Sequence, residues 1–306
     1  MLGYYTRQMT QDHDCLHRFF FEDANVRGVI VQLRDTWQQI AHRDDYPTEV
    51  RQWLAQVAAA TALFAGDVKV DGSVSVHLKS ASALRLVFAE CSSQGDMRGV
   101  ARWDTFDAIP AVPDDLRGAA GILALTVMRA NGEPKWQGMV PLEGNSLAAA
   151  FESYFNRSEQ LPTSLFFAFD GKSCAGLLLQ EVPAEGGIAR ERDAAMYEYA
   201  RTMAATIESD ELLNLSPHEI LRRLFHEETL RLLDAQPIRF QCRCSRDRAI
   251  GILRSIGPEE TAAALAESGE RVTVTCEFCN GQYSFDAIDI QQMFSGLDQD
   301  AAVTRH

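Results

Sequence analysis

Four of the seven cysteines lie near the C-terminal end of the chain, and they constrain its fold more than any other feature. One residue separates Cys242 from Cys244, and two separate Cys276 from Cys279. A terminal segment as short as residues 238–306 seldom builds enough core by itself and commonly needs a metal or disulfides. Two close pairs supply four thiolates, the donor set of a closed tetrahedral zinc site. We therefore expect a small zinc-binding domain.

The residues around the second cysteine pair are typical of a zinc-ribbon knuckle. Val272 and Val274 alternate with polar residues up to Cys276, and Asn280-Gly281 turns the chain into a second alternating stretch. The interval between the two pairs contains two predicted helices, at residues 245–256 and 258–267. The knuckle is therefore expected between two strands.

The first pair also indicates redox chemistry. A single intervening residue holds the sulfurs of Cys242 and Cys244 close enough to join in a small, strained disulfide ring that is easily made and broken. Neighbouring arginines should lower the pKa values of the thiols and promote both metal binding and oxidation; these are Arg239, Arg243, Arg246 and Arg248. A structural zinc site without further role is the simpler alternative.

The charge balance argues against nucleic acid and membrane partners. Lys and Arg number 29 against 43 Asp and Glu, which gives a formal net charge of −14. Such a surface repels phosphate backbones and anionic lipid. The longest apolar stretches fall far short of the ~20 residues of a spanning helix, and residues 1–14 do not have the pattern of a signal peptide. We expect a cytoplasmic protein, whose thiols stay reduced.

Residues 1–183 are predicted to form an α+β domain with mainly antiparallel strands. Strands are expected at 17–22, 26–33, 84–90, 121–129, 135–140, 164–169 and 174–182, with a further hairpin around Asp71-Gly72. One helix should begin at residues 46–48 and end at Gly66 as its C-terminal cap, and another should span 147–158.

Residues 184–237 show no strand pattern and are rich in charge. A helix is expected at 190–208, and a second begins at Ser216, which is followed by Pro217 and by Glu219 three residues after the cap. Their apolar faces are narrow, so we interpret the segment as a metastable helical linker. The predicted domains are thus residues 1–183, 184–237 and 238–306.

The remaining motifs give little indication of a functional site. His13, Cys15 and His17 alternate in a pattern more typical of a strand than of a metal site. Cys91 and Cys174 lie in apolar strand patterns and are expected to be inert. Residues 171–173 end like a phosphate-binding loop but lack its upstream glycine. Because no catalytic constellation emerges, we do not expect an enzyme.

Taken together, the motifs resemble those of the bacterial redox-regulated holdase chaperones, the thirty-three-kilodalton heat-shock protein family. The resemblance spans essentially the whole chain. It is carried by CRCS at 242–245, CEFC at 276–279, YSF at 283–285, YFNRSEQLPT at 154–163, FEDANVRG at 21–28 and GLLLQ at 176–180.

The resemblance implies a protein that is zinc-bound and inactive when reduced. Oxidation would convert the ligands Cys242, Cys244, Cys276 and Cys279 into the disulfides Cys242–Cys244 and Cys276–Cys279 and expel the zinc ion. The small domain and the linker would then unfold, and the exposed surface would hold unfolding client proteins without ATP. The family also implies a homodimer in the activated state.

Two alternatives remain open. A zinc-ribbon nucleic-acid binder is disfavoured because residues 238–306 contain 7 basic and 10 acidic residues, which opposes phosphate binding. A thiol-disulfide oxidoreductase would need its Cys-x-x-Cys motif in a thioredoxin-like βαβ setting, whereas here the motif is predicted between strands.

Overall fold

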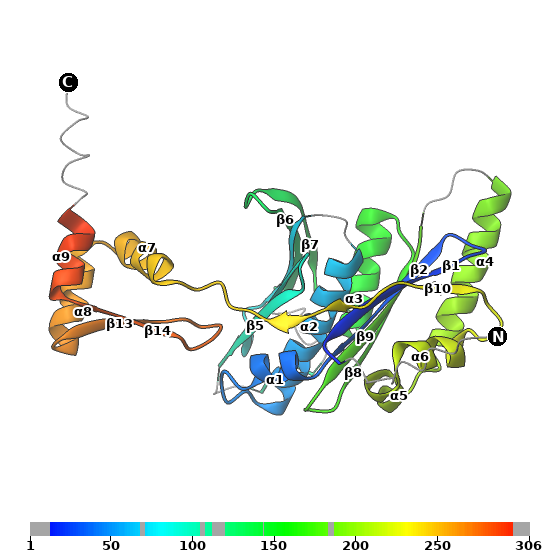
Figure 1. The fold of residues 1–306 in the computed structure, drawn as a ribbon, viewed down its shortest axis with the longest axis horizontal. Helices are drawn as coiled ribbons and strands as arrows, with labels where there is room; N and C mark the ends of the chain where they lie inside the picture. Colours follow the sequence, from blue (N-terminus) through cyan, green and yellow to red (C-terminus); the bar gives the residue numbers. More distant parts are fainter. Residues whose placement is uncertain are drawn as a thin grey trace, which may run out of the picture. The chain divides into compact units, whose positions relative to one another are not determined.

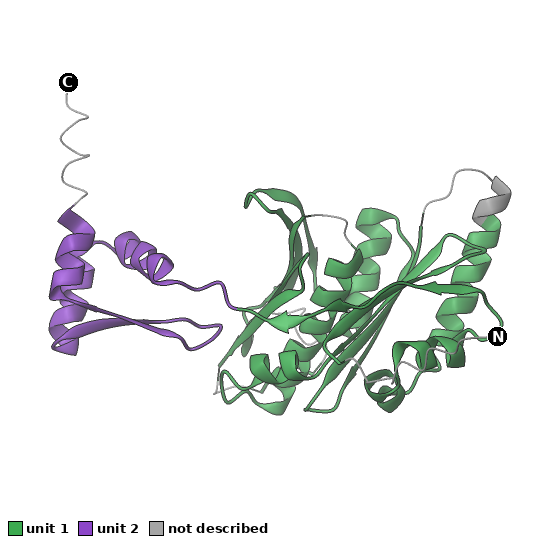
Figure 2. Cartoon of the chain, viewed as in Figure 1, with its two compact units in different colours: residues 1–241 green, residues 242–306 purple. Residues whose placement is uncertain are grey.

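The chain divides into two compact units, residues 1–241 and residues 242–306 (Figure 2). A computed structural model describes residues 13–67, 71–104, 108–111, 120–142, 144–182 and 187–295. None of the helices in these ranges is long and apolar enough to cross a membrane.

The first unit is built around helix α2, Thr48–Asp67 (Figure 1). Fourteen of its residues are buried, and they lie on all sides of the helix. A helix that is apolar all round must be enclosed, and α2 contacts strands of two different sheets. It is accompanied by α1 (Asp35–Ala41) and by α3 (Leu147–Tyr154), which continues into a π-helical turn, η2 (Phe155–Glu159).

The first sheet has the strand order β10-β1-β2-β9-β8, with β11 also paired to β1, and every pairing is antiparallel. Its strands are β1 (Cys15–Phe21), β2 (Val26–Leu33), β8 (Thr163–Phe169), β9 (Cys174–Glu181), β10 (Leu230–Leu232) and β11 (Gln236–Pro237). One face packs on α2. The sheet therefore joins the beginning of the chain to residues beyond 230.

The second sheet has the order β12-β5-β4-β3-β6-β7. Its strands are β3 (Gly72–Lys79), β4 (Leu84–Ser92), β5 (Asp96–Trp103), β6 (Ile122–Arg129), β7 (Pro134–Pro141) and β12 (Arg239–Phe240). The pairing of β12 with β5 is parallel and the others are antiparallel. The strand β12 ends two residues before Cys242.

Three helices cover the face of the first sheet that points away from α2: α4 (Gly187–Ala204), α5 (Ser209–Asn214) and α6 (Pro217–Leu224) (Figure 1). Their buried side chains, among them Tyr197, Leu213 and Leu224, form one cluster with Phe19, Ile30, Leu177 and other residues of the sheet. The segment interpreted as a linker is therefore packed on the sheet within the first unit.

The second unit is a small α+β module. It contains α7 (Arg246–Ile256), α8 (Pro258–Ser268), the hairpin β13 (Arg271–Thr275) and β14 (Gln282–Asp286), and α9 (Ala287–Ser295). Its described core has six buried residues: Ala249, Leu253, Val272, Phe285, Ile290 and Met293. So small a core gives limited stability without a further cross-link.

The expected α+β class with mainly antiparallel strands is confirmed, but two local expectations are wrong and three elements were missed. Gly66 lies inside α2 rather than at its cap; a Cβ there would be 2.5 Å from the Leu16 side chain, so the glycine permits close contact with β1. Residues 184–237 do contain strands, β10 and β11, which are too short to show a pattern. The sequence also gave no indication of α1, β5 or α9.

Of the hairpin expected around Asp71-Gly72, residues 68–70 lie outside the described residues. Its second arm exists as β3, which pairs with β4 and β6.

Candidate metal centre

The four cysteines of the second unit come from two places in its fold. Cys242 and Cys244 lie in the extended segment before α7, whose N-cap Ser245 accepts a hydrogen bond from the Arg248 N–H at 3.2 Å. Cys276 and Cys279 lie in the turn that joins β13 to β14. The N-cap of α7 thus fixes the position of Cys242 and Cys244, and the hairpin turn fixes that of Cys276 and Cys279.

The turn is the predicted knuckle. The Cys276 N–H donates to the Gly281 carbonyl at 2.9 Å, and the Asn280 N–H donates to the Cys276 carbonyl at 2.8 Å. Asn280 is left-handed, with φ 55°, a conformation that asparagine tolerates better than most residues. A Cβ on Gly281 would lie 3.2 Å from the Cys279 sulfur, so the glycine leaves room for the sulfur cluster.

The four sulfur atoms all lie within 4.8 Å of one another, and each cysteine is half-buried. The Cys242 and Cys276 sulfurs are 3.6 Å apart, and those of Cys244 and Cys279 are 3.3 Å apart. Tetrahedral zinc with Zn–S bonds of ~2.3 Å spaces its sulfurs by about 3.8 Å. The cluster can hold a metal ion, and its all-sulfur donor set fits zinc.

Tyr283 lowers the pKa of one of the four thiols. Its hydroxyl donates to the Cys244 sulfur at 3.1 Å. This hydrogen bond lowers the pKa of Cys244 to about 7 and raises the pKa of Tyr283 to about 12, because the donor stabilises the thiolate. Burial acts in the other direction on two ligands: it raises the pKa of Cys242, and it raises the pKa of Cys279 to about 12.

The expectation that arginines lower the thiol pKa values is wrong for Cys244, whose shift comes first from the Tyr283 hydroxyl. Arg246 instead pairs with Asp289 at 2.9 Å and lies over the Phe285 ring. Arg248 donates to a backbone carbonyl. Tyr283 belongs to the YSF motif of the sequence, but nothing in the sequence indicated its hydrogen bond to Cys244.

Comparison with known proteins shows which family has this sequence. The sequence profile of the Hsp33 protein family matches residues 14–286. The chain belongs to the Hsp33 family. The curated relatives include the 33 kDa chaperonin of Pseudomonas fluorescens strain Pf-5, which is 39% identical over 96% of this chain and 98% of its own length. The 33 kDa chaperonin of Shewanella sp. strain MR-4 is 40% identical over 92% and 96%.

The fold agrees with that of a solved Hsp33. The crystal structure of the 33 kDa chaperonin from Thermotoga maritima superposes with a TM-score of 0.78 over 94% of this chain and 100% of that one, at 20% sequence identity. Membership of the Hsp33 family supports a chaperone function that involves unfolded client proteins.

The other sequence motifs do not join the centre. In the described part of the chain, the four cysteines are the one group of three or more His, Cys, Asp or Glu residues whose ligand atoms converge. Cys15 and His17 lie on β1, as the strand interpretation predicted. Cys91 and Cys174 are buried, and burial raises the pKa of the Cys174 thiol, as expected for an unreactive cysteine.

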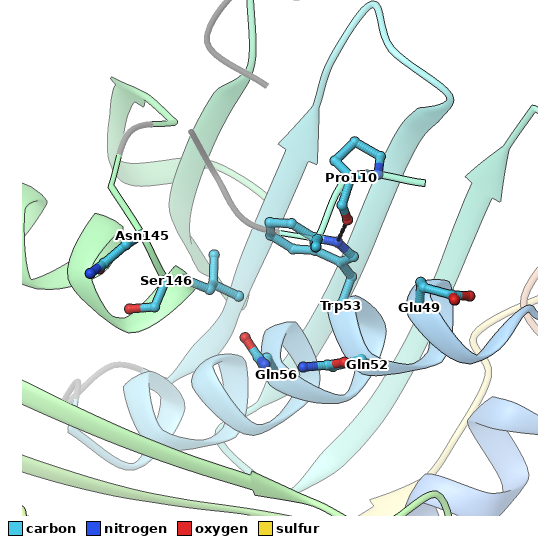
Figure 3. A pocket seen from close by; sticks show the side chains of 9 residues that line it. Glu49, Gln52, Trp53, Gln56, Pro110, Asn145 and Ser146 are labelled. Atoms are coloured by element: carbon cyan, nitrogen blue, oxygen red, sulfur yellow. Dashed lines mark hydrogen bonds between the residues drawn. The ribbon is translucent and has the colours of Figure 1, made fainter. Parts of the chain in front are cut away.

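The first unit also has an open pocket of about 220 Å³ beside α2 (Figure 3). Figure 3 shows the Trp53 ring nitrogen donating to the Pro110 carbonyl, at 2.7 Å, with Gln52 and Gln56 on the same helix, α2. Glu49 is the one ionisable residue among those described in the lining. A single exposed carboxylate offers no nucleophile–base pair, so the cysteine cluster remains the candidate site.

Proposed function

We propose that this protein is a redox-regulated, ATP-independent holdase chaperone that is zinc-bound and inactive when reduced. The observation that carries the proposal is the convergence of Cys242, Cys244, Cys276 and Cys279 within 4.8 Å in a chain of the Hsp33 family. Oxidation would release the zinc ion, unfold part of the chain and expose apolar surface to unfolding proteins.

One zinc ion per chain would be held by the four thiolates. When bound, it supplies a cross-link between the segment before α7 and the β13–β14 turn. Structural zinc sites contribute roughly 10–16 kcal/mol of apparent binding energy, which is comparable to or larger than the ~5–15 kcal/mol stability of a typical domain. A unit with six buried core residues should therefore depend on this cross-link for its fold.

Oxidation would form the disulfides Cys242–Cys244 and Cys276–Cys279. Each pair of thiolates gives two electrons to one equivalent of a two-electron oxidant such as hypochlorous acid, which becomes chloride and hydroxide. Two close sulfur–sulfur contacts in the reduced unit, at 3.6 and 3.3 Å, join opposite pairs. Two within-pair disulfides would therefore replace a cross-link of the unit with two local rings, and neither sulfur pair could still bind the metal.

The segment of residues 184–237 is the proposed moving part. Its helices α4, α5 and α6 cover an apolar face of the first sheet that includes Phe19, Ile30 and Leu177. The segment ends at β11, and β12 connects it to Cys242, so disorder spreading from the cysteine segment would reach β12 first and then β11. Release of the helices would uncover a face on which apolar client segments can bind.

The direct test follows aggregation of a thermally unfolding enzyme by light scattering, with reduced and with oxidised protein, while zinc release is measured with a chromogenic chelator. We expect about one zinc per reduced chain, and strong suppression of aggregation only after oxidation. Cys276→Ser with Cys279→Ser should bind no zinc. Equal suppression by the reduced and oxidised protein would contradict the redox switch.

Two further properties belong to the proposal. The activated state is expected to be a homodimer, which sedimentation of the oxidised protein would detect as a doubled mass. Client holding should need no nucleotide, so ATP should leave the light-scattering trace unchanged.

A further inference from the structure

The second sheet carries an apolar row that runs across five strands to an open edge. The row joins residues that lie directly opposite one another in register: Val100 on β5, Phe88 on β4, His77 on β3, Ala124 on β6 and Met139 on β7. The His77 and Phe88 rings meet edge-on at 4.5 Å. At its end, Met139 is 66% exposed.

This row lies on the face of the sheet opposite α2. Side chains alternate between the two faces of a strand. Val140, next to Met139, and Trp136, three residues before it, have the inward positions and pack against the core around α2. Ile122, whose register partner Pro141 ends β7, is 45% exposed on the same outer face. The outer end of the sheet is thus apolar and accessible.

The edge strand β7 also presents unused backbone groups. Leu142 donates its N–H to the Gly121 carbonyl directly opposite. Because antiparallel pairs alternate between bonded and non-bonded positions, Val140 and Gly138 face β6, whereas Gln137 and Met139 direct their N–H and C=O groups outward. In the described ranges no strand pairs with this side of β7.

The part of β7 that can pair with another strand is short and has a positively charged residue near one end. Pro134 and Pro141 bound the strand, and proline limits pairing at an edge. Lys135 is exposed, forms no ion pair with any described residue, and is one of only four lysines in a chain of net charge −14. Lys135 is therefore a positive charge at the Pro134 end of the edge, two residues from Glu133, whose carboxylate pairs with Arg129 at 3.6 Å.

We infer that β7 binds an extended segment of a client polypeptide as an added strand, with an apolar side chain beside Met139 and an acidic side chain near Lys135. The assignment of a client as occupant rests on the proposed function. Outward groups of Gln137 and Met139 would form the backbone hydrogen bonds, as in other cases of strand addition. The apolar residue would extend the row by one strand, and about four positions would separate it from the acidic residue.

A second copy of the chain fits this edge less well than a client segment. Two β7 strands paired about Gly138 would place Met139 opposite Gln137 and Lys135 opposite Pro141, so neither side chain would meet a complementary partner. A client strand can supply both an apolar and an acidic side chain at the required spacing.

A single added strand is expected to bind weakly and does not by itself prevent aggregation, so the edge site is compatible with a reduced protein that holds no clients. The test uses the reduced full-length protein and a fluorescein-labelled, end-capped threonine peptide with one leucine and one glutamate four positions apart. Fluorescence anisotropy should show saturable binding, about threefold weaker when lysine replaces the glutamate. Lys135→Glu should reverse this preference, whereas Lys172→Glu, a charge change at an exposed lysine of the β8–β9 turn, should leave it unchanged.

Backbone pairing is tested separately. Gln137→Pro removes one outward N–H and should weaken binding about fivefold, the effect of one net hydrogen bond. Peptides N-methylated on the side that faces β7 should lose binding to the unmodified protein, which checks the same contact without a mutation. Equal binding of methylated and unmethylated peptides would overturn the inference. So would a dimer of the reduced protein that Gln137→Pro dissociates, because the edge would then bind a second copy.

The outcomes separate this inference from the proposed function. Absence of peptide binding, together with full aggregation suppression by oxidised protein, would reject the edge site and leave the redox chaperone intact. Peptide binding at β7 without any suppression by oxidised protein would reject the chaperone switch and leave a peptide-binding edge.

Discussion

Tyr283 is the side chain whose contribution to the metal centre can be isolated most cleanly. Its hydroxyl donates to the Cys244 sulfur at 3.1 Å. Hydrogen bonds to metal ligands typically change metal affinity 10- to 100-fold when removed. Tyr283→Phe should therefore release zinc to a competing chelator at least about tenfold faster, with the fold retained because the ring remains.

The matched control is Ser284→Ala in the same strand, which removes a contact with the Thr273 hydroxyl and none with sulfur. It should release zinc at the rate of the unmodified protein. Similar release rates for Tyr283→Phe and Ser284→Ala would show that the tyrosine hydroxyl does not support the metal site.

The cysteines could be predicted from sequence, whereas their hydrogen-bond partner could not. The spacing of Cys242, Cys244, Cys276 and Cys279 fixes the donor set regardless of what surrounds it. The surroundings depend on where long side chains point, and Arg246 points to Asp289 and to the Phe285 ring. Closeness in sequence was therefore a poor guide to which charged or polar group reaches a thiol.

The helix α4 is attached to the turn between β1 and β2 by one buried carboxylate. Asp193 is 3% exposed and accepts hydrogen bonds from the backbone N–H and the side-chain amide of Asn25, each at 2.9 Å. Asp193→Ala would remove both hydrogen bonds, each of which contributes about 0.5–1.5 kcal/mol. We expect proteases to cut the α4 region of the reduced variant faster, and zinc content to stay unchanged.

The neighbouring Arg192→Ala serves as the control. Its ion pair with Asp23 spans 3.4 Å between two largely exposed side chains, and such pairs contribute ~0–1 kcal/mol. This variant should be cut at the rate of the unmodified protein. An Asp193→Ala variant as resistant as Arg192→Ala would mean that α4 is held by its apolar contacts alone.

Local signals predicted some elements and missed others for identifiable reasons. Helix α6 begins where its capping box indicates, with reciprocal hydrogen bonds between Ser216 and Glu219. The strands β10 and β11 have three and two residues, and their pairing with β1 supplies the hydrogen bonds that define them. A local sequence pattern cannot predict a strand that forms only because it pairs with a strand far away in the sequence.

The layered arrangement of the first unit depends on contacts between residues far apart in sequence. Strand β2 pairs with β9 and β1 pairs with β10, so residues near 20 and 30 lie beside residues near 180 and 230. The sequence predicted the strands and the charged helices of residues 184–237, but not that these helices cover the face that includes Phe19. This face determines what the molecule can expose when the helices leave.

The fate of residues 184–237 on oxidation is the decisive prediction for the molecule as a whole. Two of the helices in this segment, α5 and α6, have only six and eight residues and draw their stability from packing. The core around α2 involves residues from both sheets and includes none from these helices. We expect oxidised, zinc-free protein to be cut rapidly by trypsin within residues 184–237 and to leave a resistant fragment that ends near residue 183. The reduced, zinc-loaded protein should resist under the same conditions.

A control must distinguish the proposed reversible switch from irreversible unfolding of the oxidised protein. Adding dithiothreitol and zinc to the oxidised protein before the protease should restore its resistance to cleavage, because the reduced thiolates can bind metal again. If the segment stays protected after zinc has left, the apolar face of the first sheet stays covered, and client proteins must bind elsewhere. The open edge at β7 would then be the surface to test first, since it is exposed without any movement of α4, α5 or α6.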